Sequence, residues 1–203
     1  MSKEKLIIFV KNEEAGKVKT RLAKEVGDEK ALEIYQKLLS YTYDQVSPLP
    51  VTKEVCYSRF IEENDLWGER AFLKQLQKGE GLGERMSEAF RRSFDDEGFQ
   101  KTVIIGSDCA ELTLDILKEA FARLNDHEIV LGPAADGGYY LLGMKSYFPE
   151  LFTEIAWSTG SVLEKTINKA EKLGKDYTLL KQLNDVDRLE DWKQVEARFP
   201  SKL

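Results

Sequence analysis

The chain has 203 residues, of which 42% are hydrophobic and 33% are charged, and this composition is typical of a globular protein with one sizeable core. Its formal net charge of -6 disfavours general nucleic-acid binding, because contacts with a phosphate backbone usually require an excess of basic residues. The apolar run at residues 6–10 is too short for a signal peptide, and no stretch approaches the length of a membrane span. We therefore expect a cytoplasmic protein with no nucleic-acid partner and no membrane span.

The cysteines and the single histidine disfavour several kinds of catalytic and metal site. Cys56 and Cys109 lack Cys-x-x-Cys spacing, so neither a disulfide framework nor a zinc knuckle is supported. His127 lies in a polar stretch and is expected to be a solvated loop residue, which disfavours catalysis and metal sites based on histidine. Any catalysis must therefore depend on carboxylates, lysine, arginine, hydroxyl groups and a metal ion.

The predicted elements alternate between strands and helices. Residues 6–10 are typical of a buried strand, and a polar, basic segment follows at 11–24. Asp28 is a predicted N-cap, and apolar residues recur at helical spacing from Leu32 to Thr42. The later predicted elements are a strand at 51–57, a short helix and a short strand within 59–78, a glycine-rich turn at 79–83, a helix over 86–94, a strand at 102–106, a helix capped by Thr113 that continues to 124, strands at 129–132 and 139–144, a helix opened by Ser158 or Thr159 and closed by Gly174, a strand at 177–180 and a helix over 189–199.

This alternation predicts the α/β class. The expected architecture has three layers, α/β/α, with a mostly parallel mixed sheet covered by helices on both faces. No internal repeat, low-complexity segment or clear linker divides the chain, so we expect one domain over residues 1–203. Ligands of open α/β sheets bind beyond the carboxyl ends of the strands. The segments at 11–21, at Ser107 and Asp108, and at 136–138 are therefore the candidates for a binding site.

The segment after the first strand carries a local excess of basic residues in an acidic protein. Two glutamates, Glu13 and Glu14, lie among five basic residues: Lys11, Lys17, Lys19, Arg21 and Lys24. Gly16 permits a tight turn or the close approach of a ligand. Lysine and arginine here suit a di- or triphosphate, and arginine can bind two oxygens at once. A solvated loop with scattered lysines explains the spacing equally well.

Two familiar nucleotide-binding loops are absent from this segment. A Walker loop would require a serine or threonine after Lys17, where Val18 stands. The Gly-x-Gly-x-x-Gly fingerprint does not follow the first strand either, which disfavours an NAD-dependent dehydrogenase.

Asp108 directly follows the apolar strand at 102–106, with Ser107 beside it. A carboxylate at this edge of the sheet can bind Mg²⁺ or Mn²⁺, and the metal can in turn bridge phosphate oxygens. An aspartate that caps a helix or turn is common after a strand, and position alone favours that interpretation. Cys109 has no basic partner nearby in sequence, so we expect a small buried residue rather than a nucleophile.

The segment Asp136, Gly137 and Gly138 separates two predicted strands. Asp-Gly is a strong hairpin signal, which explains the first two residues without any ligand. The second glycine favours a close approach of the backbone to a ligand, with Asp136 binding sugar hydroxyls or a metal.

Asp185 and Asp187 are two residues apart, so their side chains can point the same way from an extended segment. One of them could be a second metal ligand, and a helix cap before residue 189 is an equal alternative. Trp157 could stack on a base or sugar, although packing is the commoner role of tryptophan.

Taken in order, these segments resemble a known family. The matching segments are 9–11, 16–22, 106–109, 132–143, 157–159 and 185–187, and the most specific are Lys-Thr-Arg-Leu at 19–22 and Asp-Gly-Gly-Tyr-Tyr at 136–140. Over nearly its whole length the chain resembles the radical-SAM/selenodomain-associated transferase 1 family. That is a bacterial family described as glycosyltransferases with the GT-A, or nucleotide-diphospho-sugar transferase, fold. It also looks like nucleotidyltransferases of that fold, such as molybdenum-cofactor guanylyltransferase.

The resemblance implies roles for particular residues. Asp108 matches the metal-binding aspartate after the central strand, and Asp187 matches the second ligand. Residues 16–22 look like a lysine-substituted form of the glycine-rich loop that ends in arginine, and 136–138 would lie near the sugar or acceptor. The chain departs from the family where prolines are usual, at 12–15 and at Ala110, and its two loop glutamates add negative charge beside the expected phosphate site.

The leading hypothesis is an Mg²⁺- or Mn²⁺-dependent transferase with a nucleotide donor and a small-molecule acceptor. Lys11, Lys19 and Arg21 would neutralise the phosphates, while Asp108 and Asp187 would hold the metal. The family's usual description favours glycosyl transfer. The Thr-Arg-Leu sequence at 20–22, which ends the loop at 16–22, favours nucleotidyl transfer with release of pyrophosphate. A protein that binds nucleotides or sugar phosphates without turnover is the alternative from another class.

Overall fold

The computed structural model describes residues 3–68 and 71–199, and its elements follow the alternation expected from the sequence. The strands are β1 (Glu4–Val10), β2 (Thr52–Tyr57), β3 (Phe72–Leu76), β4 (Lys101–Ile105), β5 (Ile129–Pro133), β6 (Tyr139–Met144) and β7 (Tyr177–Leu179). The α-helices are α1 (Thr20–Val26), α2 (Asp28–Val46), α3 (Leu82–Arg91), α4 (Leu114–Asp126), α5 (Val162–Lys172) and α6 (Leu189–Val195). A π-helical turn, η1 (Arg92–Asp96), extends α3, and two 3₁₀ turns, η2 (Pro149–Phe152) and η3 (Glu196–Arg198), complete the described elements.

The described strands form one seven-stranded sheet in the order β3-β2-β1-β4-β6-β5-β7. β6 is antiparallel to both of its neighbours, and the other adjacent pairs are parallel. The mostly parallel mixed sheet that the sequence predicts is therefore confirmed, as is the α/β class. Because β1 pairs with β2 on one side and β4 on the other, three carboxyl ends meet at one edge of the sheet.

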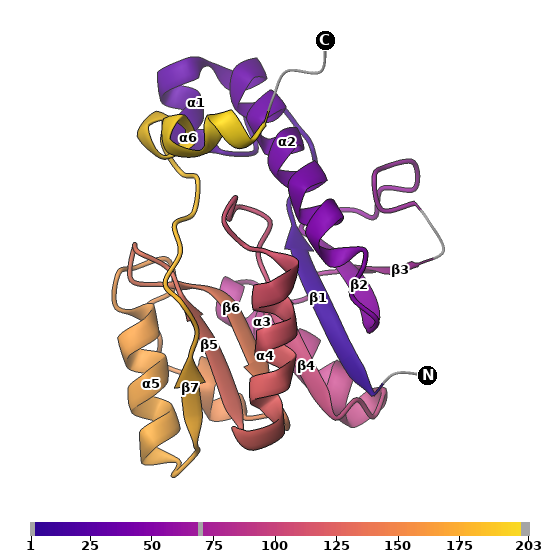
Figure 1. Cartoon of the computed structure of the whole chain (residues 1–203), viewed down its shortest axis with the longest axis vertical. Coiled ribbons are helices and arrows are strands. Elements are labelled where there is room, and N and C mark those ends of the chain that lie inside the picture. Colours follow the sequence, from indigo (N-terminus) through magenta and orange to yellow (C-terminus); the bar gives the residue numbers. More distant parts are fainter. Residues whose placement is uncertain (1–2, 69–70, 200–203) are drawn as a thin grey trace.

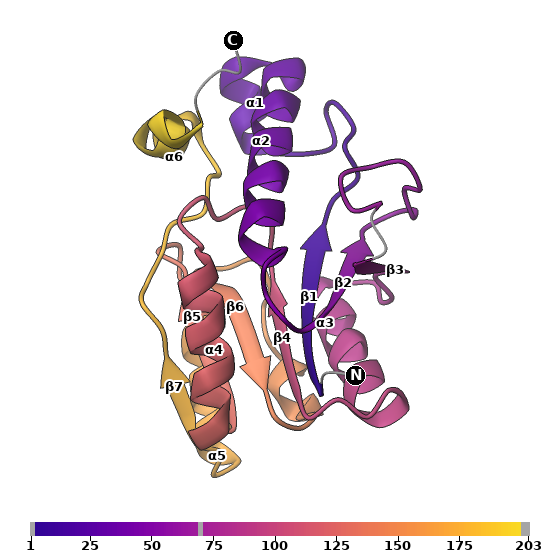
Figure 2. The same ribbon diagram turned by 45° about the vertical axis from the view of Figure 1, so that its right-hand side comes forward.

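Side chains along β1 alternate between the two faces of the sheet, as the pleat requires. Leu6 and Ile8 belong to one buried cluster, together with residues of α2 and α4, while Ile7 belongs to another, with residues of α3 and α5. Helices α2 and α4 cover the first face and α3 and α5 the opposite face (Figures 1 and 2). This alternating burial explains the continuous apolar run, because both faces of β1 are covered.

A third buried cluster lies beyond the carboxyl end of β1, where α1 and α6 pack near the start of α2 (Figure 1). Leu22 of α1 and Trp192 of α6 are both buried there. Ala110 and Val186 belong to the same cluster. The cluster therefore anchors the two segments that carry Asp108 and Asp187.

The structure differs from the sequence predictions in the presence of two helices and in the start of two others. Helix α1 begins within the segment predicted to be a polar loop and ends two residues beyond it, and Leu22 is its one fully buried residue, so no apolar period marks it. Asp28 is the first residue of α2, and Gly27, not Asp28, is its N-cap. The helix expected within 59–78 does not occur in the described part of that stretch, where bends and turns precede β3.

Helix α5 begins at Val162, later than the predicted Ser158 or Thr159. Ser158 has a φ of 62°, which a right-handed helix does not allow. Gly174, with a φ of 64°, ends α5 as predicted, and Thr113 caps α4 by accepting a hydrogen bond from the Ile116 N–H. No helix within 3–68 and 71–199 is long and apolar enough to cross a membrane.

Candidate functional site

A cleft of about 440 Å³ opens at the edge of the sheet where β1 and β4 end. It lies where ligands bind in open α/β sheets, and its volume is in the range of small-molecule sites. Of the residues predicted to form a site, the cleft is lined by Lys11, Lys19, Arg21, Asp108, Asp136, Gly138 and Asp187. The structure thus brings together segments that are far apart in the sequence.

Three other predicted residues do not line this cleft. Gly16 forms a turn at a φ of 73°, and a Cβ there would lie 3.2 Å from the Asp28 carboxylate. Gly137 has a φ of 87°, and a Cβ would lie 2.1 Å from the Gly160 carbonyl oxygen, so this glycine permits backbone packing behind the cleft. Ser107 is buried below the cleft, and its hydroxyl is 3.2 Å from that of Tyr35. These three residues therefore lie outside the cleft lining.

The segment after β1 is held in place by side chains of neighbouring elements. The Lys11 backbone N–H donates to the Tyr35 hydroxyl at 2.8 Å, which ties the end of β1 to α2. Asn12 is buried, and its amide donates to the Phe60 carbonyl and accepts from the Arg59 N–H. The Asn12 side chain therefore anchors the loop. The Lys11 side chain is exposed at the cleft.

Lys19 occupies the inner side of the cleft. Its Nζ lies 2.9 Å from Asp108 Oδ1, 3.9 Å from Asp187 Oδ1 and 2.7 Å from the Val186 carbonyl oxygen. Its backbone is left-handed, at φ 47° and ψ 44°, which is uncommon for a residue with a side chain. Lys19 therefore joins the segment before α1 to those that follow β4 and precede α6.

Arg21 lies nearer the solvent. Its Nη1 is 3.1 Å from Asp187 Oδ2, and its side chain remains 62% exposed. Because that exposure leaves most of its donors free, the guanidinium group can bind an anion without leaving α1. Together with Lys11, it gives the mouth of the cleft two exposed positive charges.

Asp185 is a cleft residue that the sequence analysis noted but did not select. Burial and the nearby charge of Asp108 raise the pKa of the Asp185 carboxyl to about 7. Asp185 and Asp187 both line the cleft, as the spacing of two residues suggested. The floor of the site thus carries three aspartates, Asp108, Asp185 and Asp187, around one buried lysine.

One wall of the cleft, on the face of the sheet covered by α3 and α5, is largely apolar and aromatic. It is lined by Phe9, Leu82, Met86, Tyr139, Leu142 and Trp157. The ring of Trp157 packs on the start of α3, where a Cβ on Gly83 would lie 2.1 Å from its Nε1. Trp157 therefore packs against α3 and also lines the cleft, so its packing role is confirmed and stacking on a base or sugar stays a prediction. Only the glycine-rich stretch at 79–83 signalled this contact.

The carboxylates of the cleft have the chemistry of a magnesium or manganese site. The side chains of Asp108 and Asp187 are 37% and 43% exposed, so their oxygens can reach a ligand. Within the residues described by the structure, no group of three acidic, histidine or cysteine side chains could hold a metal alone. Mg²⁺ commonly uses one or two carboxylates and takes its remaining ligands from water and phosphate. Asp108 and Asp187 therefore fit such an ion when a phosphate ligand completes the site.

The cysteines do not contribute a nucleophile. Cys109 is buried, and burial raises the pKa of its thiol to about 12. The thiol is therefore protonated at neutral pH, and a protonated thiol is a poor nucleophile.

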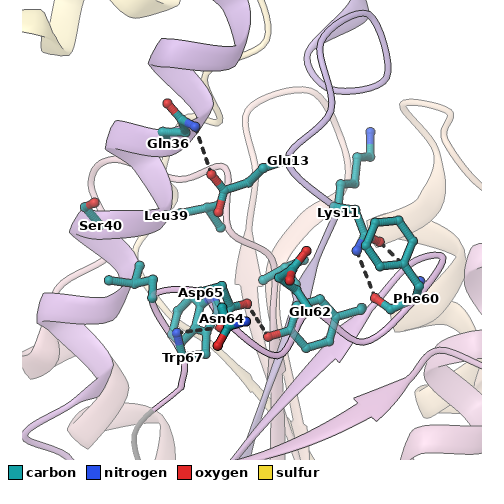
Figure 3. A pocket seen from close by; sticks show the side chains of 14 residues that line it. Lys11, Glu13, Gln36, Leu39, Ser40, Phe60, Glu62, Asn64, Asp65 and Trp67 are labelled. Atoms are coloured by element: carbon teal, nitrogen blue, oxygen red, sulfur yellow. Dashed lines mark hydrogen bonds between the residues drawn. The ribbon is translucent and has the colours of Figure 1, made fainter.

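A second cavity of about 560 Å³ lies beside the same loop, between α2 and the stretch that follows β2. Glu13 faces this cavity and accepts a hydrogen bond from Gln36 at 3.0 Å (Figure 3). Glu14 forms an ion pair with Arg59. Neither glutamate lines the cleft, and each carboxylate has a partner outside it.

Comparisons with known proteins agree with this architecture. The DUF2064 family profile, described as "Uncharacterized protein conserved in bacteria", matches residues 45–159. A protein of Desulfovibrio desulfuricans G20 described as a "putative nucleotide-diphospho-sugar transferase" has 32% identity and a TM-score of 0.89, covering 100% of this chain and 90% of that one. A comparison with curated protein sequences gives no significant match.

More distant solved structures share the fold. The inositol-1-phosphate CTP transferase of T. maritima is 15% identical, with a TM-score of 0.60 over 96% of this chain and 94% of that one. The 4-diphosphocytidyl-2C-methyl-D-erythritol synthase of Anaerococcus prevotii DSM 20548 is 10% identical, with a TM-score of 0.60 over 96% and 95%. At these identities the likeness concerns the fold alone. The family profile covers more than half of the chain, and this protein therefore belongs to the DUF2064 family of bacterial proteins.

Proposed function

We propose that this protein is a metal-dependent transferase that uses a nucleotide donor, and that its reaction is glycosyl transfer from a nucleotide-diphospho-sugar. We further propose that residues 1–203 act as one transferase domain of the radical-SAM/selenodomain-associated transferase 1 type. The observation that carries the proposal is the meeting of two exposed cations, Lys11 and Arg21, with two accessible carboxylates, Asp108 and Asp187, in one cleft. The similarity to the Desulfovibrio protein supports the choice of donor.

The cleft residues divide into groups that suit the parts of such a donor. Arg21 and Lys11 would bind the diphosphate, because both side chains are exposed at the mouth of the cleft. Asp108 and Asp187 would hold the Mg²⁺ or Mn²⁺ ion. Asp136, at the turn between β5 and β6, would accept hydrogen bonds from sugar hydroxyls. The aromatic wall would exclude water from one side of the donor.

In the proposed reaction, an acceptor hydroxyl attacks the anomeric carbon, the bond from that carbon to the diphosphate oxygen breaks, a nucleoside diphosphate leaves, and the hydroxyl proton passes to the leaving diphosphate or to water. The bound metal would supply positive charge next to the departing phosphate oxygens. Arg21 would stabilise the same charge through its guanidinium donors, and these donors are already oriented by Asp187 at 3.1 Å. Lys11 would add a second positive charge on the solvent side of the diphosphate.

Nucleotidyl transfer is the second candidate. The Thr-Arg-Leu stretch at 20–22 favours it, because Thr20 and Arg21 both line the cleft at the start of α1. In that reaction an acceptor phosphate attacks the α-phosphorus of a nucleoside triphosphate and pyrophosphate leaves. The same charged residues would serve, but the donor would carry three phosphates and no sugar beyond the nucleoside.

Thermal unfolding with a panel of nucleotide sugars and nucleoside triphosphates, with and without Mg²⁺ or Mn²⁺, tests the proposal. A ligand at a hundred times its dissociation constant should add about 2.7 kcal/mol, or roughly 5–10 °C in a chain of this size. We expect metal-dependent stabilisation by a nucleotide-diphospho-sugar, and preference for a triphosphate would instead support nucleotidyl transfer.

The matched variants are Asp108→Asn and Asp115→Asn. Asp108→Asn should abolish the metal-dependent part of the thermal stabilisation, and Asp115→Asn should leave it unchanged. Asp115 is 93% exposed in the first turn of α4 and does not line the cleft. Metal-dependent stabilisation that survives Asp108→Asn would contradict the metal assignment. Donor binding without release of a nucleoside diphosphate or pyrophosphate would favour the non-catalytic alternative.

A further inference from the structure

We propose that Lys19 is a built-in cation that occupies the metal position when no nucleotide is bound, so that the Lys19 ammonium group and a divalent ion exclude one another. The inference rests on the proposed function, because it takes Asp108 and Asp187 as the metal ligands. It goes further in predicting how binding is coupled. The phosphates of the donor would free Lys19 from the carboxylates, and the metal would enter with them.

The contacts of Lys19 are those of a bound cation. Three oxygens lie within 4 Å of its Nζ: Oδ1 of Asp108 at 2.9 Å, Oδ1 of Asp187 at 3.9 Å and the carbonyl of Val186 at 2.7 Å. Two of these oxygens belong to Asp108 and Asp187, whose carboxylates are the proposed metal ligands. An ammonium group at this place therefore uses the same ligands as the ion would.

Burial distinguishes Lys19 from the other cations of the cleft. Its side chain is 3% exposed, whereas that of Arg21, which also contacts Asp187, is 62% exposed. An exposed arginine can bind phosphate while its partner stays solvated. If the Lys19 side chain moves, its ammonium group loses its oxygen partners. Water cannot replace them at this place, because solvent does not reach the side chain.

The backbone of Lys19 supports a specific role for its side chain. At φ 47° it adopts the left-handed conformation, which glycine adopts far more readily than lysine. The residue also precedes α1 as its N-cap without making a side-chain cap bond. A small flexible residue would meet the demands of the backbone better, so the contacts of the ammonium group explain the lysine.

Charge explains why the two cations compete. A Mg²⁺ ion binds carboxylate oxygens at about 2.0–2.1 Å, and a second positive charge on those oxygens would be repelled. Metal binding alone would take from the buried Lys19 ammonium group both of the carboxylates that it contacts, which is unfavourable. Phosphate oxygens remove that cost by accepting from Lys19. Metal and phosphate should therefore bind together far better than separately.

The test measures Mn²⁺ binding to the full-length protein by calorimetry without any nucleotide. Lys19→Met removes the charge and keeps an unbranched side chain, so we expect its Mn²⁺ affinity to rise by about tenfold or more over the wild type. Lys19→Arg, which keeps the charge, should bind Mn²⁺ as weakly as the wild type. Lys17→Met is the matched control: it removes the same charge from the same loop at an exposed position and should change little. Equal effects of Lys19→Met and Lys17→Met would overturn the inference.

A wild-type experiment decides the question even if Lys19→Met does not fold. Thermal unfolding is measured with Mn²⁺ alone, with inorganic pyrophosphate alone and with both. We expect the joint shift to exceed the sum of the separate shifts, and an additive result would overturn the coupling. Mn²⁺ that binds the wild type tightly by itself, and is lost in Asp108→Asn, would refute the role of Lys19 while leaving the metal site intact. Failure of Mn²⁺ to bind any variant under any of these conditions would instead refute the proposed metal dependence.

Discussion

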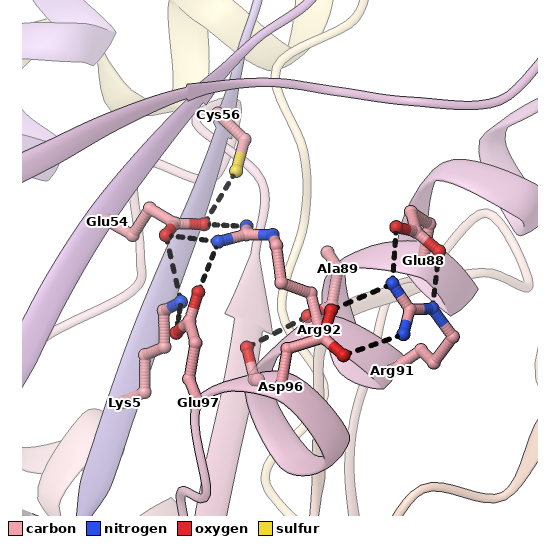
Figure 4. A network of polar contacts seen from close by, with 10 residues as sticks. Lys5, Glu54, Cys56, Glu88, Ala89, Arg91, Arg92, Asp96 and Glu97 are labelled. Carbon is pink, nitrogen blue, oxygen red and sulfur yellow. Dashed lines mark hydrogen bonds and ion pairs between the residues drawn. The ribbon is translucent and has the colours of Figure 1, made fainter.

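Replacing Glu54 by glutamine should destabilise this protein strongly, because Glu54 is the centre of a buried ion network between the sheet and the end of α3 (Figure 4). Its carboxylate accepts from Arg92 Nη1 at 2.8 Å, from Arg92 Nη2 and from Lys5 Nζ at 2.8 Å. Glu97 completes the network by accepting from Lys5 and from Arg92, each at 2.6 Å. Two positive and two negative side chains therefore neutralise one another.

The magnitude follows from burial. The side chains of Lys5 and Glu54 are 0% and 1% exposed, so removing the charge of Glu54 leaves Lys5 and Arg92 with one carboxylate between them. Breaking a buried ion pair from one side typically costs about 3–5 kcal/mol. Because the side chains of Arg92 and Glu97 are 17% and 29% exposed, water can compensate in part. We therefore expect a loss near the lower end, about 3 kcal/mol.

Glu88→Gln is the matched control for this change. Glu88 makes a two-pronged contact with Arg91, at 2.8 Å and 2.9 Å, but its side chain is 32% exposed. An exposed pair of this kind contributes about 1 kcal/mol or less. Equilibrium unfolding in urea, followed by circular dichroism, gives both free energies. Equal losses in the two variants would refute the assignment of the network as a buried, stabilising element.

The same network predicts a pH dependence. Burial by itself raises the pKa of Glu54, but the hydrogen bond and charge of Arg92, together with Lys5, lower it overall. The folded pKa is below the unfolded one, so this stabilisation is complete above the ordinary glutamate pKa of about 4.3 and is lost as pH falls through the folded value. The difference in stability between wild type and Glu54→Gln should therefore shrink on acidification. A difference that grows as pH falls would contradict this sign.

Three further predictions concern the cleft and its supports. Gly83→Ala should cost about 1–3 kcal/mol and shift the tryptophan fluorescence, because its Cβ would lie 2.1 Å from Trp157 Nε1. Gly81→Ala, where nothing lies within 4 Å of the added Cβ, should cost less than half as much, and equal costs in urea unfolding would argue against close packing of that ring. Cys109 should resist iodoacetamide at pH 8 in the folded protein and react in denaturant, since the pKa of its thiol is raised to about 12; rapid labelling of the native protein, read by mass spectrometry, would contradict its burial. Thr113→Ala should lower the free energy of unfolding by about 0.5–1 kcal/mol through loss of the α4 cap, and no change would show that its 3.4 Å bond contributes nothing.

Much of the sheet could be predicted from local sequence, because its central strands are buried on both faces and form continuous apolar runs. The antiparallel direction of β6 had one local signal. Only residues 134–138 connect β5 to β6, and a connection that short allows a hairpin but not a parallel crossover. Helix α1 had no comparable signal, since Leu22 is its one fully buried residue and only Ala23 and Val26 pack beside it against the third cluster.

The cleft could be predicted as a set of segments but not as an arrangement of side chains. The rule that ligands bind at the carboxyl ends of strands located Lys11, Asp108 and the 136–138 turn. It could not reveal that Lys19 would turn inward between two aspartates while Arg21 stayed exposed. That difference depends on the left-handed backbone at residue 19 and on the packing of α6, which brings Val186 and its neighbours to the cleft. Both are tertiary effects without a local sequence pattern.

The most direct test of the proposed function is a crystal structure with Mn²⁺ and a nucleotide-diphospho-sugar, in which anomalous scattering locates the metal. We predict one Mn²⁺ ion within about 2–2.5 Å of carboxylate oxygens of both Asp108 and Asp187, in contact with the diphosphate, and Lys19 Nζ displaced onto phosphate oxygens. Mn²⁺ bound elsewhere, or a donor bound in the cleft with Lys19 still between the two aspartates, would contradict the account.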